Sequence, residues 1–171
     1  REFDAVVVLE DDRTDIAVLR MEEVDKPLPA LEMGDSDSLQ VGDLVLAIGN
    51  PFGVGQTITS GIVSGLARSS VGVTDFRSFI QTDAAINPGN SGGALVDAHG
   101  NLIGINTVIY TKSGGSQGIG FAIPSNLTKQ VMQDLIQYGR VIRGWLGIEV
   151  QQLTPQLAES FGLKDTRGLI I

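Results

Sequence analysis

Hydrophobic residues along this chain gather in short runs, and turns rich in glycine, proline, asparagine and aspartate separate these runs. Short apolar runs bounded by such turns are typical of β-strands. The pattern predicts strands at 4–9, 14–20, 41–49, 56–64, 92–97, 102–106 and 119–123. Because no helical segment alternates with these strands, the series indicates an all-β barrel rather than a parallel α/β sheet.

A helical period appears only after the last of these strands. Apolar residues at helical spacing predict a helix that opens at 124–126 and stops at Gly139. Its apolar face carries Leu127, Val131, Met132 and Leu135. Beyond it, the pattern predicts a strand at 143–150, a short helix at 154–162 with Thr154 as its N-cap, and the start of a further strand at 169–171.

Composition narrows the range of partners. The 171 residues suffice for one ordinary domain or slightly more, and 42% of them are hydrophobic, so a core can form. The net charge of −8 argues against nucleic acid or an anionic membrane surface as partner. There is no cysteine, hence no disulfide and no thiolate metal site, and no apolar run approaches the ~18 residues of a membrane span. Because the chain opens directly into a predicted strand, we expect it to start inside a domain.

One stretch, 81–95, stands out for its chemistry. It contains Gly89-Asn90-Ser91-Gly92-Gly93. Glycines let a turn adopt backbone angles that other residues resist, so such a turn can present the serine oxygen and aim amide hydrogens at one point. A nucleophile beside oxyanion donors is what acyl transfer requires. The alternative is a glycine-rich hairpin with an incidental serine, since short motifs give false positives.

Two protein architectures use a serine between glycines in this way. The nucleophile elbow of α/β-hydrolases requires a helix directly after the serine. Here the apolar runs 92–97 and 102–106 flank a turn at 98–101, which predicts a β-hairpin. The context therefore favours a loop of an antiparallel barrel over the elbow.

Two further residues are candidates for a triad with Ser91. His99 is the only histidine of the chain, but it lies at the predicted hairpin tip, a position usually exposed to solvent. Asp15 lies at the start of a predicted strand, where an aspartate is usually a cap or a solvated charge. It would take part in catalysis only if a histidine lay nearby in space.

Five segments in one order resemble the HtrA/Deg serine proteases. The protease segments read TDIAVL at 14–19, AIGNPFG at 47–53, QTDAAINPGNSGG at 81–93 and GIGFAIPS at 118–125. The fifth, RGWLG at 143–147, resembles the opening of the PDZ domain that follows the protease in that family. Because the resemblance covers nearly the whole chain, it is far more specific than any one motif.

The resemblance implies a chymotrypsin-like double β-barrel with a His-Asp-Ser triad in that chain order. Ser91 would be the nucleophile, and Asp15 would orient the histidine. The backbone amides of Gly89, Asn90 and Ser91 would line the oxyanion hole. No cofactor and no metal ion is implied, since triad hydrolysis needs neither.

The substrate pocket also follows from the family pattern. Ala85 and Ile86, just before the serine loop, and Ile109 with Tyr110, on the strand after the hairpin, would line the primary pocket. Two β-branched isoleucines facing each other would leave a small, dry pocket. We therefore expect Val, Ala, Ile or Thr before the scissile bond.

The chain departs from the family at one essential point. The family's histidine precedes the aspartate, and no histidine precedes Asp15 here. The implied domains are a remnant of the first protease barrel at 1–33, the second barrel at 34–123, a connecting helix at 124–143 and the N-terminal part of a PDZ domain at 144–171. Without its base, this fragment alone is expected to be inactive.

The sequence thus leaves three functions open. The first is an endopeptidase of protein quality control that cleaves unfolded or misfolded polypeptides in the bacterial periplasm or cell envelope. As the resemblance implies, the full-length protein would assemble into trimer-based homo-oligomers through segments that this chain lacks. The second is a non-catalytic peptide-binding or chaperone module of the same fold, and the third is a β-barrel interaction domain. A histidine upstream in the full-length gene would favour the enzyme.

Overall fold

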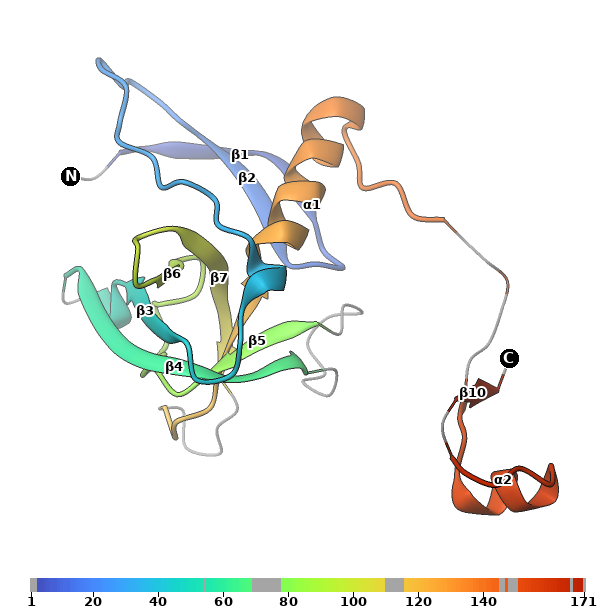
Figure 1. Ribbon diagram of the computed structural model, residues 1–171. Coiled ribbons are helices and arrows are strands. Elements are labelled where there is room, and N and C mark those ends of the chain that lie inside the picture. The colour runs from blue at the N-terminus through green and yellow to red at the C-terminus, as the bar shows by residue number, and fades with distance from the viewer. Residues whose placement is uncertain are drawn as a thin grey trace. The chain divides into compact units, whose positions relative to one another are not determined.

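The computed structural model describes residues 3–53, 55–68, 78–109, 116–144, 147, 151–166 and 168–170. They belong to two compact units, Arg1–Val141 and Ile142–Ile171. The first unit is mostly β and contains a closed six-stranded barrel, a separate two-stranded sheet and one long helix (Figure 1). The predicted all-β barrel is thereby confirmed.

The chain begins with an antiparallel pair, β1 (Ala5–Asp11) and β2 (Ile16–Met21). The turn between them is built by local hydrogen bonds. The amide and the hydroxyl of Thr14 both donate to Oδ2 of Asp11, at 3.1 and 2.6 Å. Asp15 then takes a left-handed conformation with φ of 58°. These contacts delay the second strand to Ile16, whereas the sequence pattern predicted its start at residue 14.

Six antiparallel strands close the barrel in the order β3-β4-β5-β8-β7-β6, with β3 pairing β6. Short 3₁₀ turns, η1 (Ser36–Ser38) and η2 (Pro51–Gly53), precede and follow β3. The barrel strands are β3 (Leu44–Gly49), β4 (Thr57–Arg68), β5 (Phe79–Thr82), β6 (Ala94–Asp97), β7 (Leu102–Ile109) and β8 (Gly120–Pro124). Each predicted barrel strand is present, although β4 and β7 extend beyond the predicted ends.

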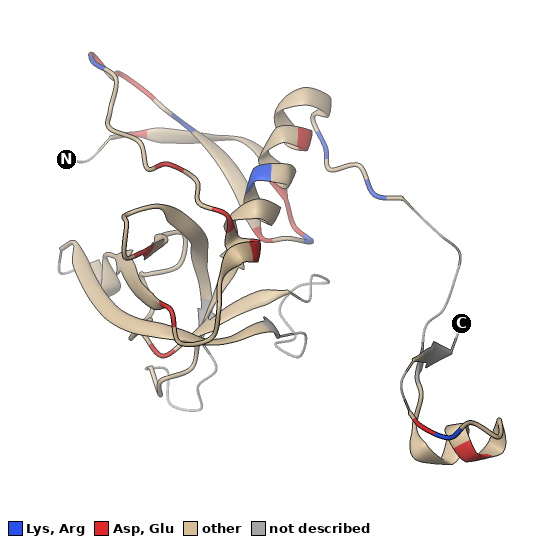
Figure 2. Cartoon of the chain, in the orientation of Figure 1, with Lys and Arg blue, Asp and Glu red and all other residues tan. Residues whose placement is uncertain are grey.

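The barrel interior is apolar and nearly free of solvent. Burial of a Val, Leu or Ile side chain stabilises a fold by roughly 1.5–3 kcal/mol, so this core is the main source of the barrel's stability. Its side chains come from all six strands and from the segment before the serine loop: Val45, Ala47, Val63, Ile80, Ala84, Ile86, Leu95, Ile103 and Ala122. Few charged residues lie on the barrel strands, as Figure 2 shows.

A second apolar cluster joins the barrel, the β1–β2 sheet and helix α1 (Ser125–Tyr138). Val131 and Leu135 of the helix are each 1% exposed in this cluster, and Gly139 ends the helix with φ of 71°. The predicted apolar face and stop are therefore confirmed. Pro124 offers no side-chain cap, and Ser36 of η1 instead accepts a hydrogen bond from the Asn126 amide at 3.1 Å.

The second unit holds β9 (Gln151–Gln152), α2 (Pro155–Ser160) and β10 (Leu169–Ile170). β9 pairs β10 in antiparallel fashion, and the Thr154 side chain caps α2 by accepting a hydrogen bond from the Leu157 amide. Both the helix and its cap were predicted. Residues 143, 144 and 147 are not in a strand, and the rest of the predicted strand up to residue 150 lies outside the described residues. Neither α1 nor α2, the α-helices of the described segments, is long and apolar enough to cross a membrane.

Candidate active site

Ser91 lies on an exposed loop that leads into β6, between two glycines with positive φ. Gly89 has φ of 102° and Gly92 has φ of 82°, conformations that side chains disfavour. The Ser91 hydroxyl donates to the backbone carbonyl of Thr107 on β7, with 2.6 Å between the oxygens. The predicted glycine-dependent turn is therefore present, and it leaves the serine accessible to solvent.

The segment before the serine is held firmly against β4. Asp83 accepts a hydrogen bond from the Ile62 amide at 2.7 Å, and Thr59 donates to the Ala85 carbonyl at 2.9 Å. A Cβ atom at Gly61 would collide with the backbone of Ala84, so glycine is required for this close approach. The loop therefore starts from a rigid base, which a precisely placed nucleophile needs.

Asp15 and Ser91 meet at one residue of the barrel. The Thr107 hydroxyl donates to Oδ2 of Asp15 at 3.1 Å, while its carbonyl accepts from Ser91. The aspartate belongs to the β1–β2 turn and the serine to the barrel, so the fold unites residues that are far apart in the chain. Thr107 was not singled out from the sequence. A polar Asn106-Thr107 pair inside an otherwise apolar strand was the signal that could have found it.

The three predicted oxyanion donors differ in this structure. The Asn90 amide donates to the Asn87 carbonyl at 3.0 Å, so it is engaged within the loop. Among the described residues, none accepts a hydrogen bond from the amide of Gly89 or of Ser91. These two amides are the ones available to a developing oxyanion, and their role stays a prediction.

The predicted pocket residues are only partly described. Ile86 is 1% exposed and packs in the barrel core, where it lies against Gly120 of β8. Ala85 is half-buried, and its carbonyl also accepts a hydrogen bond from Nδ2 of Asn90 at 3.4 Å. The Ile109 side chain and the whole of Tyr110 lie outside the described residues. The assignment of the primary pocket therefore stays a prediction.

His99 lies at the tip of the β6–β7 hairpin, as predicted, and its side chain is 86% exposed. Its Nδ1 atom is 3.8 Å from Oδ2 of Asp97, and its amide donates to Oδ1 of the same carboxylate. Burial alone would raise the pKa of Asp97, but hydrogen bonds from Asn101 and from the His99 amide hold this pKa below its ordinary value. These hydrogen bonds to the Asp97 carboxylate organise the hairpin turn.

The surroundings of Asp15 are acidic. A pocket of about 110 Å³ lies at the β1–β2 turn, and three further carboxylate residues share it with Asp15: Glu10, Asp11 and Asp12. Negative charge at this turn would favour the protonated form of an imidazole placed there. In the described part of the chain, no group of three or more His, Cys, Asp or Glu residues could hold a metal ion.

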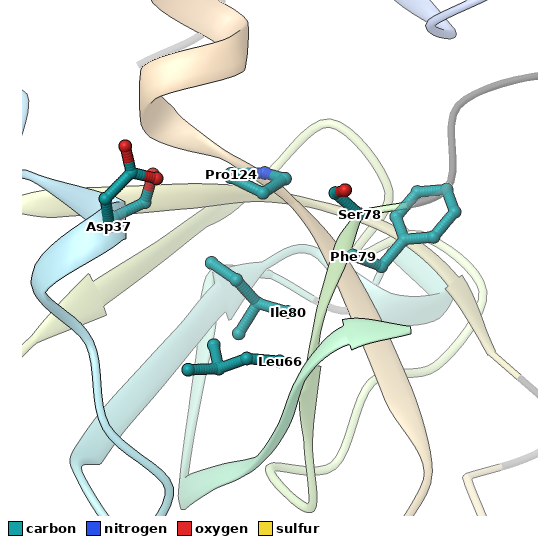
Figure 3. Close-up of a pocket in the computed structure, with 7 residues that line it drawn as sticks. Asp37, Leu66, Ser78, Phe79, Ile80 and Pro124 are labelled. Carbon is teal, nitrogen blue, oxygen red and sulfur yellow. The ribbon is translucent and has the colours of Figure 1, made fainter. Parts of the chain in front are cut away.

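A larger pocket, of about 270 Å³, lies elsewhere, between η1, β4, β5 and the end of β8. Leu66, Ile80 and Pro124 line it beside the carboxylate of Asp37 (Figure 3). Neither Ser91 nor the other residues of the candidate site are among its lining residues, which are completed by Ser36, Ser78 and Phe79. The candidate site around the serine is therefore separate from this pocket.

Comparison with known proteins agrees with the geometry. The family model of the trypsin-like peptidase domain matches residues 1–105. The periplasmic serine endoprotease DegP of Salmonella typhimurium is 53% identical over 171 residues, which are all of this chain and 36% of that protein. The periplasmic pH-dependent serine endoprotease DegQ of Escherichia coli is 51% identical over the same length, 37% of that protein.

Solved structures give the same result. A structure of the HtrA-type protease AlgW with a decapeptide has a TM-score of 0.84 and 61% sequence identity, and the match covers 99% of this chain and 52% of that one. The chain thus spans about a third of the length of the curated relatives that it matches.

Proposed function

Because the chain belongs to the HtrA/Deg family of trypsin-like serine proteases, we propose that it carries the nucleophile and the aspartate of a serine endopeptidase. The observation that supports this most directly is the bridge through Thr107, which accepts from Ser91 and donates to Asp15. A fold that brings a glycine-flanked serine and a carboxylate to one residue offers two of the three groups of a triad.

In the proposed reaction, Ser91 attacks the carbonyl carbon of a peptide bond as a histidine removes the hydroxyl proton. The same histidine then protonates the leaving amine, and water releases the acyl group from the serine. Asp15 would hold the histidine in the correct tautomer, and the amides of Gly89 and Ser91 would stabilise the oxyanion. His99 is the chain's one histidine and is held in a hairpin turn, so we place the base in a part of the protein outside these 171 residues.

The whole protein is proposed to work in the periplasm on unfolded polypeptides. The location follows from relatives that are named periplasmic serine endoproteases. In the proposed architecture, β1 and β2 belong to the first barrel of a chymotrypsin-like fold, the closed barrel is the second, and the second unit begins a PDZ domain. Trimer-based assembly and the boundaries at 33, 123 and 143 are part of the same proposal.

The 171-residue chain by itself is expected to leave unfolded casein intact, whereas the full-length gene product cleaves it. Loss of a triad member lowers turnover by several orders of magnitude, because serine is a weak nucleophile without its base. Fragments are followed by gel electrophoresis over time for both proteins.

Two results would count against this division of the site. Cleavage by the short chain that disappears on Ser91→Ala would mean that a base lies within these residues. An intact full-length protein that binds casein without cleaving it would favour the alternative of a peptide-binding or chaperone module.

The full-length protein is also expected to cut after small, branched or short side chains such as Val, Ala, Ile and Thr. The proposed pocket of Ala85, Ile86, Ile109 and Tyr110 is apolar, and a charged side chain that entered it would lose water without gaining a partner. Each methylene is worth only about 1–3 kcal/mol, so the preference is graded. Mass spectrometry of a digested denatured protein maps the sites, and predominant cleavage after Lys, Arg or Phe would contradict the pocket.

A further inference from the structure

The pairing between β3 and β6 ends just where the serine loop leaves the barrel. The two strands pair from Val45 with Asp97 to Ala47 with Leu95. The next pair in that register would be Ile48 with Ala94, and it is missing from the ladder. Two backbone carbonyls at this point therefore need donors from another element, because buried carbonyls are almost always hydrogen-bonded.

Asn106 of β7 supplies both donors. Its Nδ2 atom lies 3.2 Å from the Ile48 carbonyl oxygen and 3.1 Å from the Ala94 carbonyl oxygen. Since both partners are acceptors, the amide nitrogen must face them. The Asn106 side chain is 0% exposed, so it acts as a bridge where β3 and β6 separate.

The backbone of Asn106 holds the same loop from the other side. Its carbonyl accepts from the Gly92 amide, and its amide donates to the Gly93 carbonyl, each at 2.8 Å. Gly93 lies so close to the Ile48 carbonyl that a Cβ atom there would collide with it. The two residues after Ser91 are thus fixed between Asn106 and the end of β3.

The choice of asparagine carries a cost in stability. The Oδ1 atom of Asn106 is buried and accepts no hydrogen bond from the described residues. A buried polar atom without a partner is destabilising, whereas an apolar residue would avoid that cost. A leucine, however, would leave the Ile48 and Ala94 carbonyls without donors, and an aspartate would place negative charge against them. Only a side chain with two donor hydrogens at the δ position can donate to both carbonyls.

We propose that Asn106 is a positioning residue for the nucleophile. Its side chain fixes the distance between β3 and β6 where they separate, and this sets the place of Ser91. The inference rests on the proposed peptidase function. Asn106 does not touch the reacting atoms; it acts through the peptides of Gly92 and Gly93. Its loss should displace the serine and its amide, and a displacement of about 1 Å can cost on the order of 100-fold in rate.

The test compares Asn106→Leu and Asn106→Ser with the wild type in the full-length protein. Asn101→Leu is the matched control, because Asn101 lies on the same hairpin and its side chain donates to Asp97 at 3.0 Å, away from the serine. The first readout is the rate constant for reaction of Ser91 with a fluorophosphonate, which depends on the activated nucleophile and the oxyanion donors and needs no peptide substrate. The second is kcat and KM for a peptide substrate, each corrected for the folded fraction by circular dichroism.

We expect the fluorophosphonate rate and kcat to fall by about 10- to 100-fold in Asn106→Leu, with KM within about twofold and with the control unchanged. In Asn106→Ser, the hydroxyl is one atom shorter than the amide and cannot donate to both carbonyls, so its rates should fall as well, and this variant carries the test if the leucine variant does not fold. Folded-fraction rates equal to wild type in both variants would overturn the inference and leave Asn106 a structural residue. A wild-type protein that does not react with the fluorophosphonate would instead overturn the proposed function.

Discussion

Ser91→Ala in the full-length protein is expected to reduce cleavage of unfolded casein by about 10⁴- to 10⁶-fold. The substitution removes the oxygen that would form the acyl bond, and water attacking without a covalent intermediate is far slower. The fold should survive, because Ser91 is exposed and its hydroxyl makes only the hydrogen bond to the Thr107 carbonyl among the described residues.

Steady-state cleavage rates and the thermal midpoint together check this expectation. Ser78→Ala is the matched control, since Ser78 is also exposed and lines the pocket at η1. The control should keep wild-type activity. If Ser91→Ala retained more than about a tenth of the wild-type rate at equal folded fraction, another nucleophile would have to be sought.

Asp15→Asn is expected to lower kcat by roughly 10⁴-fold with a smaller change in KM. An asparagine can still accept the hydrogen bond from Thr107, so the bridge to β7 is retained. What is lost is the negative charge that fixes the tautomer of the histidine and stabilises its protonated form. The backbone should tolerate the change, because φ of 58° at this position suits asparagine as well as aspartate.

Asp12→Asn separates this role from a general effect of charge. Asp12 lies in the same turn and lines the same acidic pocket, so its substitution removes one negative charge from the same region. We expect it to change kcat by less than about threefold, in line with the weak effect of solvent-exposed charges. Equal losses of kcat in the two variants would mean that the turn acts through its overall negative charge and that Asp15 is not a specific partner of the histidine.

Local chemistry explains why so much of the fold could be predicted from the sequence. A strand shows its buried face in the order of its own residues, so five of the six barrel strands were found without knowledge of their partners, and only the four-residue β5 was missed. Helix ends depend on neighbours a few positions away, and therefore the stop at Gly139 and the cap by Thr154 were also predicted. The serine loop belongs to this class, because its positive φ angles are met by glycines beside the serine.

Contacts between distant segments were decided by the tertiary structure alone. Ser36 caps α1 from another part of the chain. The two neighbouring polar residues of β7 proved to connect separate segments: Asn106 bridges β3 and β6, and Thr107 binds both Asp15 and Ser91. The turn at Asp15 also ended later than predicted, because Thr14 binds Asp11. The physical reason is that a residue's own sequence neighbours encode burial and backbone angle, whereas which strands meet depends on closing the whole barrel. Asp15 lies outside the barrel, and only the packing of the β1–β2 sheet in the first unit brought it to Thr107, which also binds Ser91.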